Sequence, residues 1–394
     1  MVFPQSYSWV KALLLFAYFT TNLLVHKQRP WPNFIRSDLI FYSVLVGVAI
    51  FWSLVGLLNG NDLRGIYAGL KIYGAWSFVF LCIVTLEKRR ESFMLLHTAF
   101  VAAAIVISAI NIVGASDVYF GTGILPGALR EELGMIINFH GDYIKTHSYN
   151  IASLFFLCSY LLALVVAQPA TQKRSWKVFV TFVLCLITVV ISGRRALWVT
   201  IVLTPVVVAV LSMLTGRTGA RLIFIQKRVF GSLSLLLVAA GGAVVFLYTR
   251  PENQIMEYFL SSFSADDERS IQFSYLLNGI YENLLLGSGF GSNAGYTRSS
   301  EEPWLYELSY LQMLYNFGVV GCLLLSGLFF TYLLAALRSI RRLRAKTTVP
   351  LGVLVGFWAI AIGAYSNPYF QYFDGLFYVA MFVIITSHGP GLSR

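Results

Sequence analysis

The feature that most constrains this chain is a series of about eleven apolar blocks, most of them roughly 17 to 25 residues long and separated by polar connections. A helix of that length spans the hydrocarbon layer of a bilayer. We therefore predict an all-α polytopic membrane protein, a single integral membrane domain over residues 1–394 with about 11 (10 to 12) transmembrane helices. The blocks lie at about 9–25, 39–58, 66–86, 93–114, 148–167, 176–192, 196–214, 229–248, 304–337, 349–366 and 370–387.

The composition agrees with this prediction. The chain is 57% hydrophobic and 12% charged, which is about half the charge of a typical soluble protein. The first apolar block ends without a small-residue cleavage site, so we expect no cleavable signal peptide. The four cysteines have no paired spacing and lie within or beside apolar blocks, so we interpret Cys82, Cys158, Cys185 and Cys322 as small core residues.

The net charge of +11 is distributed in a way that predicts topology. Lys and Arg fall in short clusters between apolar blocks, which argues against a nucleic-acid partner. The odd-numbered connections carry more than twice as many of them as the even-numbered ones. By the positive-inside rule the odd connections are cytoplasmic. We expect a multi-pass protein of the bacterial inner membrane, with a periplasmic N-terminus and a cytoplasmic C-terminus.

The longest polar stretch, residues 249–303, is then a large periplasmic loop. It is acidic, rich in turns and too long for a simple hairpin, so it is the most plausible place for chemistry. An apolar-periodic segment, 271–286, predicts a short helix within it. The run GSGFG at 287–291 allows positive φ. It lacks the Lys-Ser/Thr of a phosphate-binding loop, and we interpret it as a chain reversal toward the membrane.

A second outer loop covers residues 115–147, where we predict a short interfacial helix around Ala128 to Phe139. His140, Asp142 and His147 match no closed zinc pattern, so we predict no metal site. Lys145 or His147 could help to hold an anion.

Two arginines, Arg194 and Arg195, occupy a short connection on the side that is otherwise poor in cations. Guanidinium groups beside the membrane cost desolvation energy, so they are usually paired or functional. One interpretation is snorkelling to lipid phosphates. The other is an anion site for a phosphorylated substrate, because Arg offers a fixed bidentate fork for phosphate oxygens.

Glu307 stands four residues after Pro303, at the entrance of the long ninth block. It has two interpretations. A carboxylate at a helix start interacts favourably with the macrodipole. Alternatively, Glu307 is a general base that takes a proton from a sugar hydroxyl.

Several segments resemble the motifs of the O-antigen ligase/polymerase superfamily, in the same order and with similar spacing over about residues 147–375. ISGRRALWV is similar to its Ser-Arg-centred motif. ERSIQFSYLLNGIYENLLLGSGFG resembles its Arg, then Glu-Asn-Pro, then Gly-x-Gly segment, with Leu284 where Pro is usual. ELSYLQMLYNFGVVG resembles its helix-entrance motif, and HSYNIASL and SNPYFQYFDG match looser family patterns.

The resemblance implies a glycosyltransferase without metal or cofactor that acts on an undecaprenyl-diphosphate-linked oligosaccharide. Arg195 and Arg269 match the motif arginines and would bind the diphosphate, with Arg194 and Arg298 as further ligands. Glu307 would be the base, and candidate glycan contacts are His147, Asn150 and Tyr310. Ligases of the superfamily carry His where Glu307 stands, so the departure favours a polymerase of surface-polysaccharide repeat units.

Two alternatives stay open. One is a ligase-type transfer of glycan to an acceptor. The other is a transporter of polyprenyl-linked glycan or lipid, which would place charges near the bilayer midplane and show internal repeats. Besides the lipid bilayer and the lipid-linked oligosaccharide, a polysaccharide chain-length regulator is a further candidate partner.

Overall fold

The computed structural model describes residues 36–77, 90–140, 143–168, 175–215, 267–342, 348–365 and 367–371, with a few isolated positions besides. Within these ranges there are ten α-helices, and five of them are long and apolar enough to cross a membrane. This confirms a multi-pass helical membrane protein. Most of the apolar blocks 9–25, 229–248 and 370–387 lies outside the described residues, as does the first part of the large loop.

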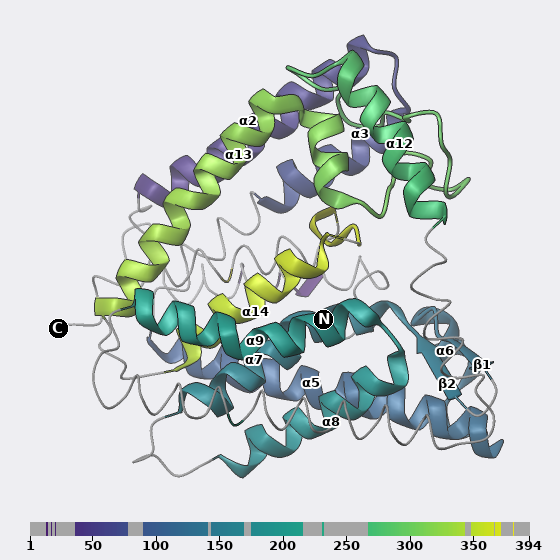
Figure 1. Cartoon of the computed structure of the whole chain (residues 1–394), viewed down its shortest axis with the longest axis vertical. Coiled ribbons are helices and arrows are strands. Elements are labelled where there is room, and N and C mark those ends of the chain that lie inside the picture. Colours follow the sequence, from purple (N-terminus) through teal and green to yellow (C-terminus); the bar gives the residue numbers. More distant parts are fainter. Residues whose placement is uncertain are drawn as a thin grey trace. The chain divides into compact units, whose positions relative to one another are not determined.

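The chain divides into two compact units (Figure 1). Unit 1 comprises residues 1–6, 93–266 and 340–363. Unit 2 comprises residues 7–92, 267–339 and 364–394. Each is described below by itself.

Unit 1 is built around α7 (Ala152–Ala167), which is apolar on all sides and almost entirely buried. α14 (Val349–Gly363), α9 (Arg195–Leu214) and α8 (Trp176–Ser192) pack against it. Glycines permit the closest approach, because a Cβ at Gly352 would lie 2.9 Å from the ring of Tyr160 and one at Gly356 would lie 2.7 Å from Phe156. A helix that is hydrophobic all round is expected to be buried, and α7 is the core of this unit.

α5 (Arg90–Phe120) adds an aromatic contact to that core. The Phe100 ring lies 5.2 Å from both Phe156 and Tyr160, measured between centroids, with edge-on geometry. Cys158 and Cys185 are buried, as expected of small core residues, whereas Cys322 is only partly buried and Cys82 lies outside the described residues.

The second outer loop corrects one prediction. The expected helix from Ala128 to Phe139 is wrong beyond its first turns, because α6 covers only Gly127–Glu132. Gly134 then takes a positive φ of 53°, and β1 (Ile136–His140) pairs antiparallel with β2 (Tyr143–His147). Paired Ile and Phe residues favour a strand over a helix. In the ladder His140 opposes Tyr143 and His147 opposes Ile136, which separates the two histidine backbones by about 13 Å.

Unit 2 contains α2 (Arg36–Leu58), α3 (Leu63–Gly69), the π-helix η1 (Leu70–Trp76), α12 (Asp267–Glu282), α13 (Ser309–Arg342) and the short η3 (Tyr369–Gln371). α12 confirms the helix predicted in the large loop. α13 begins five residues after the predicted apolar block does, and it is interrupted at Gly318, where φ is 61° and ψ is −174°. Figure 1 shows the resulting two arms.

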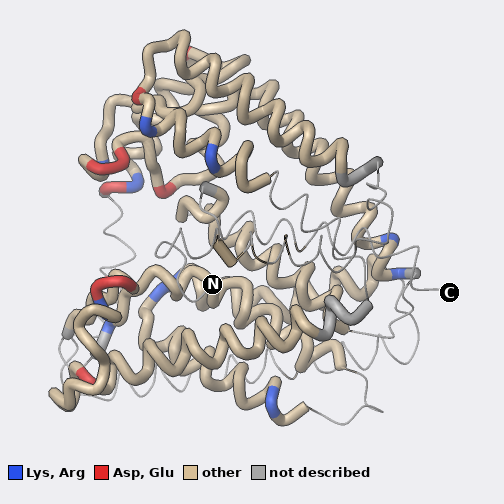
Figure 2. The backbone as a smooth tube through the Cα atoms, turned by 180° about the vertical axis from the view of Figure 1, so that it is seen from behind, with Lys and Arg blue, Asp and Glu red and all other residues tan. Residues whose placement is uncertain are grey.

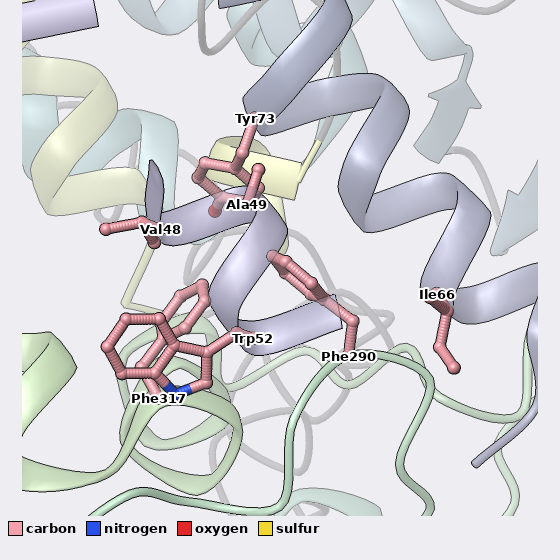
Figure 3. Close-up of a cluster of buried hydrophobic side chains, with 7 residues drawn as sticks. All are labelled: Val48, Ala49, Trp52, Ile66, Tyr73, Phe290 and Phe317. Atoms are coloured by element: carbon pink, nitrogen blue, oxygen red, sulfur yellow. The ribbon is translucent and has the colours of Figure 1, made fainter. Parts of the chain in front are cut away.

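The core of unit 2 is an aromatic cluster between α2, η1, α13 and the GSGFG run (Figure 3). The ring of Phe317 lies 5.6 Å from Trp52 and 5.3 Å from Phe290, both edge-on, measured between centroids. Tyr73 stacks on Phe290 at 5.6 Å. Phe290 therefore anchors the loop in the same core that joins α2 to α13.

The glycines of the GSGFG run allow backbone to pack directly on backbone. Gly287, Gly289 and Gly291 all have positive φ, and a Cβ at any of them would lie within 2.5 Å of another segment's backbone. The amides of residues 287–290 donate to the carbonyls of Asn283, Tyr315, Asn316 and Trp52. Because these four donors are already engaged, the run is a chain reversal and not a phosphate cradle.

The break in α13 predicts a difference between two glycines of the same helix. Gly318→Ala should lower stability by about 2 kcal/mol or more, because its backbone conformation is strained for other residues and its Cβ would collide with the Leu285 carbonyl. Gly327→Ala should be neutral or stabilise by up to about 1 kcal/mol, since nothing lies within 4 Å of its Cβ position. Thermal unfolding in detergent measures both, and equal melting temperatures would contradict the assignment.

Candidate functional site

In unit 2 the carboxylate of Glu307 forms ion pairs with two arginines, Arg269 and Arg298. Arg269 Nε donates to Glu307 Oε2 at 2.9 Å, and an Arg298 terminal nitrogen donates to Glu307 Oε1 at 2.7 Å. The side chains are 36%, 37% and 19% exposed for Arg269, Arg298 and Glu307, so the group is open to solvent on the arginine side. Figure 2 shows acidic and basic positions beside each other in the described part of the large loop, residues 267–303. We call these three residues the arginine–glutamate cluster.

Two side chains of α12 are hydrogen-bonded to Glu307. Arg269 contacts its carboxylate, and three residues further on Gln272 Oε1 accepts the backbone N–H of Glu307 at 3.0 Å. Residues three apart lie on the same face of a helix, so both contacts come from one side of α12. Gln272 is fully buried, and its Nε2 has no partner within the described part of the chain. Gln272 was not among the residues predicted from the sequence, although a glutamine that interrupts an apolar-periodic segment is a visible signal.

Tyr306, the residue before Glu307, shapes the loop that carries Arg298. Its buried hydroxyl accepts the Ala294 N–H at 2.7 Å and lies 3.0 Å from Asn293 Oδ1 and 3.1 Å from the Tyr296 carbonyl. Burial raises the pKa of Tyr306 to about 12, so the hydroxyl keeps its proton at neutral pH and can donate.

Gln312 fixes the same turn from α13. It accepts the Tyr306 N–H at 3.0 Å and donates to the Trp304 carbonyl at 2.6 Å. The backbone at Glu307 and just before it is thus bonded to the buried side chains of Gln272 and Gln312, which helps to hold the carboxylate in one position.

This geometry defines what the cluster can do chemically. Arg298 also lies 3.7 Å from the carboxylate of Glu268, so the two guanidinium groups face two acidic side chains at a partly exposed position. Guanidinium binds phosphate oxygens in a planar, bidentate manner, so an anionic ligand could exchange with these carboxylates. Both Glu307 oxygens accept from an arginine. For Glu307 to take a proton from a substrate, one guanidinium has to move to another anion.

Unit 1 brings together a second pair of predicted residues. An Arg194 terminal nitrogen lies 3.1 Å from His147 Nδ1 and 3.4 Å from Nε2. Arginine is always a donor, so the imidazole nitrogen facing it accepts. Gly193 ends α8 in a left-handed conformation with φ of 60°, Arg194 caps α9, and Arg195 is its first residue. That Arg194 and Arg195 bind the same diphosphate as Arg269 stays a prediction.

The two other candidate glycan contacts have different environments. Asn150 is fully buried, where its Oδ1 accepts from Asn111 Nδ2 at 2.9 Å and lies 2.8 Å from the Ser148 hydroxyl. In this structure its side chain therefore faces protein. Tyr310 is 45% exposed at the start of α13, with its ring 6.2 Å from that of Phe370.

A buried carboxylate that was not among the predicted site residues lies near the end of α5. Asp117 pairs with Arg130 and accepts from the Thr122 hydroxyl and the Ile124 N–H, each at 2.7 Å. These contacts close the turn between α5 and α6. The signal was an acidic residue just after an apolar block, and its bonding indicates a structural role.

No protein-family model matches this chain, and neither a curated protein nor a solved structure matches it. Among the residues that the structure describes there is no group of three or more His, Cys, Asp and Glu side chains placed to hold a metal ion.

The cluster predicts a local stability effect. Glu307→Ala removes the shared partner of Arg269 and Arg298, and because the group is partly exposed we expect a loss of about 1 kcal/mol of local stability. In detergent, trypsin should then cleave after Arg298 ~5-fold faster. Glu301→Ala, an exposed position in the same loop, is the matched control and should leave the cleavage rate unchanged. Identical rates for both variants would mean that Glu307 does not hold the loop.

Proposed function

We propose that this protein polymerises undecaprenyl-diphosphate-linked oligosaccharide repeat units into a surface polysaccharide, at the periplasmic face of a bacterial inner membrane. It would be a metal-independent integral membrane glycosyltransferase that resembles the O-antigen ligase/polymerase superfamily. The observation that supports the proposal most strongly is the arginine–glutamate cluster. Three of the residues predicted from the sequence to form the site, Arg269, Arg298 and Glu307, are joined by ion pairs of 2.7 and 2.9 Å through the Glu307 carboxylate.

The proposed reaction follows from these side chains. A sugar hydroxyl of one repeat unit attacks the anomeric carbon of the donor glycan, and the bond between that carbon and the phosphate oxygen breaks. The lipid diphosphate leaves with the electron pair. Arg269 and Arg298 would stabilise its developing charge, a role that preorganised donors fill well. As the guanidinium groups turn to the diphosphate, Glu307 becomes available to accept the hydroxyl proton.

The motif resemblance also assigns a phosphate-binding role to two arginines of unit 1. Arg194 and Arg195 stand at the tight turn between α8 and α9, the type of position where interfacial arginines are paired or functional. His147, held beside Arg194, and the exposed Tyr310 are the candidate glycan contacts that have accessible side chains.

The first test concerns the arginines. Arg195→Ala and Arg269→Ala should each reduce polysaccharide synthesis by about 100-fold or more, since removal of one charge-stabilising donor typically costs that much. Arg338→Ala, about 30 Å along α13 from Gly318, is the control and should keep wild-type synthesis. Membrane levels of each variant confirm insertion. Wild-type product from both Arg195→Ala and Arg269→Ala would remove the diphosphate site from the proposal.

The second test separates a polymerase from a ligase. A strain lacking this gene is complemented with wild type or with Glu307→Gln, which keeps the shape of the side chain but removes its basic oxygen. Surface glycan on a gel should lose its long-chain ladder while a single repeat unit stays attached to its acceptor, because ligation survives. Loss of the single-unit band, with lipid-linked long chains accumulating, would instead assign the ligase reaction.

A further inference from the structure

The turn between α12 and the GSGFG run presents three leucines away from the protein. Leu284, Leu285 and Leu286 are all exposed, and Leu285 is the most exposed of them at 68%. The adjacent Tyr281 is also exposed. Three consecutive exposed leucines are unfavourable in water, because each leaves a large apolar surface hydrated.

The three carbonyls of this turn all have hydrogen-bond donors within the protein, which a loop exposed to water does not require. The carbonyl of Leu284 accepts the Val319 N–H at 2.9 Å, and that of Leu285 accepts the Val320 N–H at 3.1 Å. The carbonyl of Leu286 accepts the indole N–H of Trp52 at 2.7 Å. Non-helical backbone is tolerated at membrane depth only where its polar groups have partners within the protein. This turn meets that condition at each of its three carbonyls.

The leucines also continue the apolar faces of two candidate membrane spans. On α2 the exposed residues include Leu54, Leu57 and Leu58, which recur at helical spacing on one face. On α13 they include Leu323 and Leu324, which lie about one helical turn after Val320, a residue bonded to the turn. Such outward apolar stripes on spanning helices face lipid chains.

We propose that the turn Leu284–Leu286 inserts into the hydrocarbon layer beside the C-terminal part of α2 and the Gly318 break of α13, with its side chains among lipid chains. Tyr281 then lies at headgroup level, where tyrosine is enriched, and the exposed Glu282 and Asn283 reach the aqueous boundary. The turn ties the C-terminal end of α12 to the membrane surface. This inference rests on packing alone and holds whatever reaction the protein catalyses.

Single-cysteine variants test the depth of the turn. In a background with the four native cysteines replaced, Leu285→Cys is compared with Leu323→Cys as the lipid-facing reference, which has the same 68% exposure, and with the exposed Ser300→Cys as the water-facing reference. Each is labelled in detergent with a bimane maleimide. The protein is then reconstituted into phosphatidylcholine–phosphatidylglycerol vesicles, with brominated acyl chains or with iodide present on both sides.

We expect the Leu285→Cys label to be quenched by brominated lipid as strongly as Leu323→Cys, several-fold more than Ser300→Cys, and to resist iodide. Quenching by iodide at the level of Ser300→Cys would place the turn in water and overturn the proposal. Resistance to both quenchers would place it against protein, such as a second copy, and would also overturn it. Leu284→Cys repeats the measurement at a second position, and gel filtration of each variant verifies the fold.

Discussion

The structure of unit 2 depends on pairing the backbone polar groups of a non-helical segment that lies against membrane helices. The helix α13 stops being helical at Gly318, and the amides that follow this break bond to the carbonyls of Leu284 and Leu285. Before the break, the carbonyls of Tyr315 and Asn316 accept hydrogen bonds from the backbone N–H groups of Ser288 and Gly289 in the GSGFG run. An unpaired peptide group in an apolar environment costs several kcal/mol, of the order of ~2–7. The backbone groups freed by the break in α13 are therefore the partners of the backbone groups in residues 284–289, and neither segment would be satisfied without the other.

This backbone pairing also positions the charged residues. Phe290 fills the aromatic core beneath the loop, and Asn61 donates to the carbonyls of Ser288 and Phe290 at 2.7 and 3.0 Å. From that fixed base the chain returns through Tyr306 to Glu307, where α12 contributes Arg269 and Gln272. The half-exposed arginines thus stand on a rigid support, which a binding site for a charged group requires.

Much of this architecture could be predicted from local sequence. The length and apolar character of 176–192 and 196–214, with Gly193 between them, predicted α8 and α9 almost to the residue. The periodicity before Gly287 predicted α12. The β1–β2 hairpin was missed, because six helical residues at Gly127–Glu132 suggested a longer helix and strand pairing is not visible in a single segment. Gln272 was missed for the same reason, since its partner is 35 residues away.

The sequence by itself determined that this is a multi-pass helical membrane protein, because long apolar blocks leave the backbone no other way to satisfy its hydrogen bonds in lipid. It also marked Arg194 and Arg195 as unusual, since charges next to apolar blocks are costly, and it placed Arg269, Arg298 and Glu307 in or beside the large polar loop. Only the tertiary structure decided that the three meet, that the glycine run packs against α2 and α13, and that Leu285 faces outward. Those outcomes depend on contacts between segments as far apart as Trp52 and Leu286, and no local pattern encodes such a contact.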